Sequence, residues 1–201
     1  MDTPIDRRAM LLGVCALTTA ASNPCLGAQR VGAVMTATGT AFLERSSSRI
    51  AAVGGTDVIL DDLVGTGEES RLDLQLGRAT RIKLGALSQL KIDRFIAGTS
   101  VDIELLEGPA FIDRGRGAEP GFTVTSPYAL IAARGTTFFA GPSAGVFGVF
   151  VRNGSVDVRT QAGTVRLHAG EGTDIASPGA SPTAPKQWGQ PRIAAALGSV
   201  S

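Results

Sequence analysis

Apolar residues occupy every second position through most of the chain after residue 30. In residues 72–76, 82–84 and 101–105, leucine, isoleucine or valine alternates with a charged or amide residue. The same alternation recurs in residues 90–92, 122–125, 156–159 and 165–168. Because successive side chains of a strand point to opposite faces, this pattern predicts short strands with one face in a core and one in water.

Three stretches are continuously apolar instead. They are residues 129–133, 138–140 and 146–151, the last interrupted by Gly148. A continuous run is typical of a strand that is covered on both faces. We expect these strands to form the centre of the domain.

Turn-forming residues separate the strands. Glycine accounts for 26 of the 201 residues, and aromatic residues for only 5%. Asn153-Gly154 predicts a two-residue hairpin, because both residues tolerate the positive φ that such a turn requires. The chain is therefore expected to be all-β.

The N-terminus has the outline of a signal peptide, residues 1–28. Arg7-Arg8 precede a short apolar stretch, residues 9–21, and Leu26-Gly27-Ala28 supplies a cleavage point. The stretch is shorter than the roughly 20 residues that a membrane-spanning helix needs, so no stable span is expected after cleavage. The arginine pair resembles a twin-arginine signal, with an ordinary secretory leader as the alternative. Either route predicts a periplasmic or secreted protein.

The sequence offers little catalytic chemistry. Cleavage after Ala28 would remove Cys15 and Cys25, and the one histidine, His168, lies on an alternating strand where an exposed side chain is expected. We therefore expect no catalytic residue, no metal site and no cofactor. A net charge of +1 without a basic cluster also argues against nucleic-acid binding.

A group of acidic residues lies between positions 57 and 69. It consists of Asp57, Asp61, Asp62, Glu68 and Glu69. Their spacing is not that of a dedicated calcium loop. A solvated acidic loop is the favoured interpretation, with calcium binding as the alternative.

The chain carries an ordered series of short motifs: Val31-Gly32-Ala33-Val34 with Gly39-Thr40-Ala41, residues 63–67 with 70–74, residues 122–127 through Arg134-Gly135-Thr136, and residues 153–156 with Ala169-Gly170-Glu171. This series resembles the FecR domain, a periplasmic module. Ser126 replaces the threonine that precedes proline in the family pattern.

The resemblance implies an all-β domain over residues 29–176, a small roll or solenoid-like stack of short strands, with a two-sheet β-sandwich as the alternative. It also implies a role in protein contact. Members of the best-known branch span the inner membrane, receive a signal from a TonB-dependent transporter and control a sigma factor. Because no cytoplasmic segment precedes the leader here, we expect a stand-alone envelope domain rather than a sigma-factor regulator.

The expected function is that of a non-enzymatic periplasmic sensory or adaptor domain that binds an envelope protein in signalling. A structural module, or one that binds a cell-wall glycan, is the alternative. A carbohydrate-active enzyme is disfavoured, because sequence alone places no pair of carboxylates across a cleft.

Two sets of residues are singled out. Arg134, Gly135 and Thr136 are predicted to form a structural turn, with Gly135 permitting a bend that a β-carbon would obstruct. Arg114 and Arg116 lie in a polar, glycine-rich segment and are predicted to be exposed partner contacts.

Residues 177–201 form the last predicted segment. Prolines 178, 182, 185 and 191 indicate a flexible tail. Residues 191–197 could form a short helix within it.

We predict that the exported protein begins near Gln29, because the leader ends in the small residues that signal peptidases accept. Intact-mass analysis of the protein outside the cytoplasm measures this. A chain that keeps Met1 in a membrane fraction would contradict the prediction.

Overall fold

The structure is a computed structural model, and it describes residues 29–96, 100–115 and 121–201. Strands dominate this part of the chain, which contains one helix. The predicted signal peptide and Arg116 lie outside the described residues, so the predictions made for them remain predictions.

Nine strands form the first sheet, in the order β18-β17-β14-β13-β10-β7-β6-β1-β4. Their bounds are β1 Arg30–Thr38, β4 Asp57–Ile59, β6 Arg71–Leu76, β7 Thr80–Leu84, β10 Ala110–Arg114, β13 Thr137–Ser143, β14 Val146–Asn153, β17 Glu171–Ile175 and β18 Lys186–Gln187.

Nine more strands form the second sheet, in the order β16-β15-β12-β11-β9-β8-β5-β2-β3. Their bounds are β2 Ala41–Arg45, β3 Ser48–Ala51, β5 Leu63–Thr66, β8 Gln89–Ile96, β9 Ser100–Glu107, β11 Phe122–Thr125, β12 Leu130–Ala133, β15 Ser155–Arg159 and β16 Thr164–His168.

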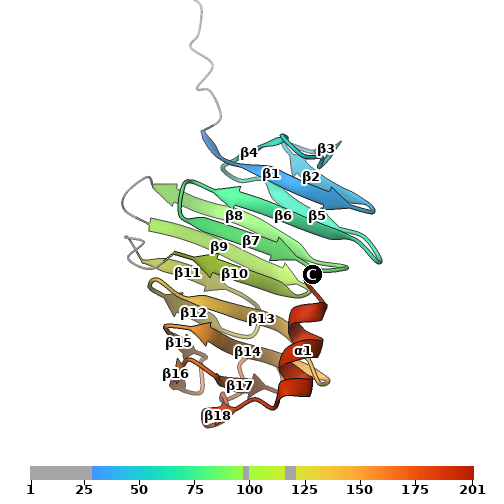
Figure 1. Ribbon diagram of the computed structural model, residues 1–201. Coiled ribbons are helices and arrows are strands. Elements are labelled where there is room, and N and C mark those ends of the chain that lie inside the picture. Colours follow the sequence, from blue (N-terminus) through green and yellow to red (C-terminus); the bar gives the residue numbers. More distant parts are fainter. Residues whose placement is uncertain (1–28, 97–99, 116–120) are drawn as a thin grey trace, which may run out of the picture.

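The chain passes back and forth between the two sheets. β6 and β7 pair in the first sheet, β8 and β9 pair in the second, and β10 then returns to the first. Neighbouring strands are antiparallel, apart from the parallel pair β9 and β11. Successive pairs therefore follow one another along the molecule, as Figure 1 shows. The all-β prediction is confirmed, in the form of two large sheets.

The main hydrophobic core contains the inward-facing side chains of both sheets. Leu74 of β6 and Ile92 of β8 have no exposed surface, and the cluster extends from Val31 to Ile175. Burying one such side chain contributes about 1.5–3 kcal/mol. The period-two pattern thus identified the core correctly.

The continuous apolar runs divide into two kinds. In β12, Ile131 is fully buried but Leu130 is 39% exposed. Residues 129–133 are therefore covered on one face only, and the prediction of coverage on both faces is wrong for this strand. In β13, by contrast, Phe138 and Phe139 are both fully buried. β14 has the same double coverage from Phe147 to Val151.

The second layer over β13 and β14 is the C-terminal segment. Helix α1, Gln190–Gly198, lies beside the first sheet in Figure 1. Trp188, Ala196 and Val200 are buried there with Phe139 and Phe150, in a cluster separate from the main core. The structure therefore corrects the predicted flexible tail, because the outer face of these strands is apolar and residues 188–200 cover it.

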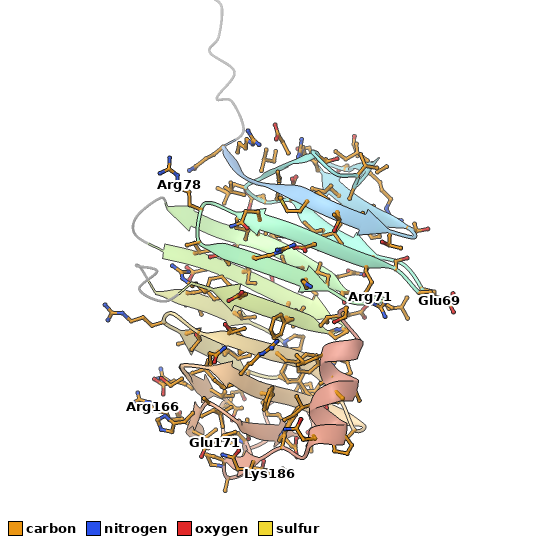
Figure 2. The ribbon with its side chains drawn as sticks, in the orientation of Figure 1. Glu69, Arg71, Arg78, Arg166, Glu171 and Lys186 are labelled. Atoms are coloured by element: carbon orange, nitrogen blue, oxygen red, sulfur yellow. The ribbon has the colours of Figure 1, made fainter. Side chains whose placement is uncertain are left out.

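A half-buried carboxylate links this segment to the sheet. Asp174 of β17 accepts hydrogen bonds from Arg192 and Lys186, each at 2.6 Å, and Figure 2 shows Lys186 at the β18 end of the molecule. The Arg192 guanidinium also lies 3.7 Å from the centre of the Trp188 ring. Both cations belong to the C-terminal segment, so Asp174 fastens it.

Among the described residues, no helix is long and apolar enough to cross a membrane.

We predict that Asp174→Asn destabilises the C-terminal segment by about 1–2 kcal/mol at pH 7, because it removes the shared partner of two cations. Trp188 is the only tryptophan, so its fluorescence reports on this segment directly. Asp157→Asn is the control, because the Asp157–Arg166 pair is exposed and screened by solvent, so its removal should change stability much less.

The contribution of the Asp174 link should also depend on pH. Burial alone would raise the pKa of Asp174, but hydrogen bonds from Arg192 and Lys186 outweigh it and lower the pKa. This contribution is therefore complete above the ordinary pKa of an aspartate, about 4, and is lost as the pH falls through the lowered value. Equal stability of Asp174→Asn and the unmodified protein at pH 7 would contradict the proposed link.

Candidate binding groove

A large hollow lies where several connections between strands meet. It has a volume of about 740 Å³, and we call it the apolar groove. Its lining residues are Ala86, Leu87, Leu105, Leu106, Glu107, Gly108, Pro109, Pro127, Tyr128, Pro142, Gly145, Val146, Phe147, Ala176 and Pro178.

Aromatic and aliphatic side chains dominate its surface. The Tyr128 ring stacks on the Phe147 ring, with centroids 4.6 Å apart and planes 8° from parallel. Leu87 is 58% exposed, which is second only to Val53 among the large hydrophobic residues that the structure describes. Concave apolar surface with a few polar groups is typical of binding sites.

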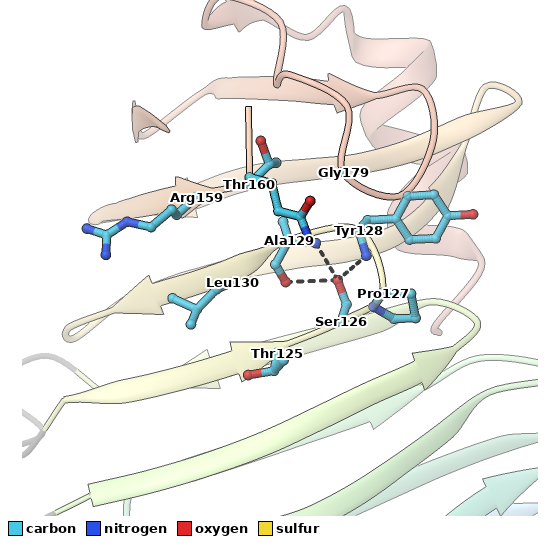
Figure 3. Close-up of a pocket in the computed structure, with 10 residues that line it drawn as sticks. Thr125, Ser126, Pro127, Tyr128, Ala129, Leu130, Arg159, Thr160 and Gly179 are labelled. Atoms are coloured by element: carbon cyan, nitrogen blue, oxygen red, sulfur yellow. Dashed lines mark hydrogen bonds between the residues drawn. The ribbon is translucent and has the colours of Figure 1, made fainter. Parts of the chain in front are cut away.

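A smaller hollow of about 300 Å³ lies at the turn between β11 and β12 (Figure 3). Both hollows share Pro127 and Tyr128. The Ser126 hydroxyl accepts a hydrogen bond from the backbone N–H of Ala129 at 3.0 Å and donates to the Ala129 carbonyl at 3.0 Å. Ser126 thereby fixes this turn from within.

Buried hydroxyl groups hold the connections beneath the groove. The Thr66 hydroxyl donates to the Gly85 carbonyl at 2.6 Å, and the Ser88 hydroxyl donates to the Pro109 carbonyl at 3.0 Å. Gly108 has a φ of +74°, and a β-carbon there would lie 2.5 Å from Ser88 Cα. Only glycine fits this position without displacing the backbone.

Arg134, Gly135 and Thr136 occupy the connection where the chain leaves β12 for β13 in the other sheet. Gly135 has a φ of +59°, Arg134 is exposed and Thr136 is fully buried. None of the three lines either hollow. Their predicted role as a structural turn stays a prediction.

Asn153-Gly154 lies at the connection between β14 and β15, where the chain also changes sheets. The hairpin predicted for these two residues is therefore wrong. β14 and β15, on either side of them, belong to different sheets and do not pair. Gly154 has a φ of +85°, and a β-carbon there would lie 2.4 Å from Thr136 Cγ2. Positive φ is needed here, as expected, but to change sheets rather than to reverse a strand.

Arg114 is not the exposed contact that the sequence suggested. It is the last residue of β10 and only 3% exposed, with its guanidinium 5.3 Å from the centre of the Phe122 ring. Burial lowers the pKa of Arg114. The alternation could have shown this, because Arg114 shares the inward face of β10 with Ala110 and Ile112.

Asp62 is also buried, contrary to the prediction of a solvated acidic loop. Its oxygens accept hydrogen bonds from Arg45 at 2.7 and 2.8 Å and from the Ile59 N–H at 2.9 Å. His168 is exposed, as predicted. No three His, Cys, Asp or Glu residues of the described chain are grouped to hold a metal ion.

A family model described as FecR protein matches residues 62–166, which is 105 of the 201 residues. The chain belongs to the FecR family. The match includes Pro109, between β9 and β10, and Tyr128, between β11 and β12. Most of the residues that line the apolar groove therefore lie within the FecR region. No curated protein matches the sequence.

Two solved structures resemble the FecR chain. Both are crystal structures of a "putative anti-sigma factor" from Parabacteroides distasonis, at 1.65 and 2.50 Å resolution. Each has a TM-score of 0.58 and 20% identity and covers 67% of this chain; the matched part is 64% and 63% of the neighbours' own length. This chain therefore spans less than two thirds of those proteins, and the likeness shows the fold.

The sequence did not single out the groove residues. Pro127 was interpreted as part of a family motif and Pro178 as part of a flexible tail. Nothing in the pattern shows that the connections of Pro109, Pro127, Pro142 and Pro178 converge. Leu87 gave the one usable signal, an apolar residue in the turn that begins at Gly85.

We predict that Gly135→Ala costs about 1–2 kcal/mol, because a β-carbon is disfavoured at positive φ. Gly198→Ala is the control: Gly198 lies in α1 with no atom within 4 Å of an added β-carbon, so alanine should be neutral or stabilising. Denaturant unfolding measures both. If Gly135→Ala unfolds like the unmodified FecR chain but loses partner binding, the motif is a recognition site instead.

Proposed function

We propose that this chain is a non-enzymatic FecR-type sensory or adaptor domain of the bacterial envelope, and that its apolar groove binds a protein partner in signalling. The observation that carries the proposal is the groove itself. It combines a volume of about 740 Å³ with the exposed Leu87 and the stacked Tyr128–Phe147 pair.

Family membership supports the regulatory part of the proposal. The solved neighbours are each described as a "putative anti-sigma factor", a name that indicates regulation. For this chain we propose the broader role, protein contact in envelope signalling. Export by the leader, residues 1–28, would place the groove outside the cytoplasm.

The groove suits a protein side chain better than a reactive centre. Its one charged lining residue is Glu107, whereas acid–base chemistry commonly uses two positioned groups. Apolar anchors that enter a hollow are the usual source of affinity between proteins.

A cell-wall glycan is the alternative ligand, and the smaller hollow favours it. Arg159, Thr160 and Gln161 present polar groups there beside Tyr128. Sugars are recognised by such a combination of hydrogen-bonding groups and an aromatic ring. Soluble peptidoglycan fragments that bind at Arg159 and not at Leu87 would support this alternative.

Site-specific photo-crosslinking in the producing bacterium tests the proposal. A photoreactive residue at Leu87 should capture one defined envelope protein, whereas the same residue at Met35 should not. Met35 is the matched control, because it is 50% exposed and apolar but lines neither hollow.

A charge in the groove should remove that product. With the photoreactive residue at Val146, Leu87→Asp should abolish the crosslink and Met35→Asp should leave it. Equal capture from positions 87 and 35 would contradict a partner site in the groove.

A further inference from the structure

The groove also indicates the chemistry of its occupant. We infer that the apolar groove binds an extended apolar segment that carries a lysine or arginine, with the cation held by Glu107 and the Tyr128–Phe147 pair. This inference rests on the proposed function and specifies the partner further.

The first observation is the charge of the lining. Glu107 is its one charged side chain, and it is exposed at the end of β9. Among the described residues, none forms an ion pair with Glu107. The carboxylate is therefore available to a cation from outside, whereas an acidic ligand would meet repulsion.

The second observation is the shortage of hydrogen-bond donors. Four of the lining residues are prolines, which have no backbone N–H. The Leu87 N–H already donates to the Gly67 carbonyl at 3.0 Å. A carboxylate or phosphate would find few donors here, while a ligand that brings its own N–H groups needs none.

The third observation is the aromatic surface. The Tyr128 and Phe147 rings stack face to face, and Tyr128 remains half-exposed at the boundary of the two hollows. The exposed face of an aromatic ring attracts an ammonium or guanidinium group. Leu87 and Pro109 beside it provide contact surface for the apolar residues of the same segment.

Two synthetic peptides test the inference. They are acetylated, amidated dodecapeptides with alternating leucines, identical except that three lysines in one are glutamates in the other. Each is titrated into the exported protein labelled with ¹⁵N, and the amide signals of Leu87, Glu107 and Val146 are followed. The lysine peptide should shift these signals and bind more tightly than the glutamate peptide.

Glu107→Gln should then lower the affinity for the lysine peptide by about threefold to fivefold, as expected for loss of an exposed ion pair. Glu104→Gln is the matched control, because Glu104 lies on the same strand but lines neither hollow. The Glu104→Gln variant should bind the lysine peptide with the affinity of the unmodified protein.

The outcomes separate the two proposals. If both peptides shift the groove signals with equal affinity, or the glutamate peptide binds more tightly, the groove is a peptide site but the inferred charge preference is wrong. If neither peptide shifts the groove signals, both the inference and the protein-binding groove are overturned.

Discussion

The fold depends on one constraint: the chain must change sheets repeatedly without leaving a gap in the core or an unpaired backbone group at the corners. An unpaired buried polar group costs about 1–3 kcal/mol, so each corner needs its own partners. Thr66 and Ser88 supply them through hydroxyl groups, and Ser126 does so at the turn that borders the groove. Glycines at positive φ, such as Gly108 and Gly154, allow neighbouring corners to lie in contact.

The groove follows from how these corners are built. Proline and glycine satisfy the backbone geometry of a sharp connection, but neither has a long side chain that could fill the space between one connection and the next. Pro109, Pro142 and Gly145 leave such space, and the stacked rings of Tyr128 and Phe147 line part of it. The residues that form the turns thus leave a concave apolar surface. Water solvates such a surface poorly, so binding of a partner there is favoured.

The sequence predicted what depends on local geometry. Alternation located the inward faces of β6 and β9, because side-chain direction follows residue parity in any strand. It did not show which strands pair, so Asn153-Gly154 was interpreted as a hairpin although its two strands lie in different sheets. Arg114 was predicted to be exposed because its charge was given more weight than its position in the alternation, which is that of the inward-facing Ala110 and Ile112.

The C-terminal segment shows the same limit on a larger scale. Phe139 and Phe150 revealed in the sequence that something covers the outer face of β13 and β14, but the cover is Trp188 and the helix after it. The proline content predicted a flexible segment, because composition describes the conformational freedom of an isolated chain. It does not show that the segment packs on an apolar sheet face in the folded protein.

The groove and this C-terminal segment are physically connected. Ala176 and Pro178, which line the groove, follow directly after Asp174, the residue that fastens the segment through Arg192 and Lys186. The backbone just before this wall is held by the pairing of Ile175 with Phe147, and the side chain of Asp174 holds the C-terminal segment. The FecR match ends at residue 166, before both, so the part of this groove that Ala176 and Pro178 form lies outside the matched region.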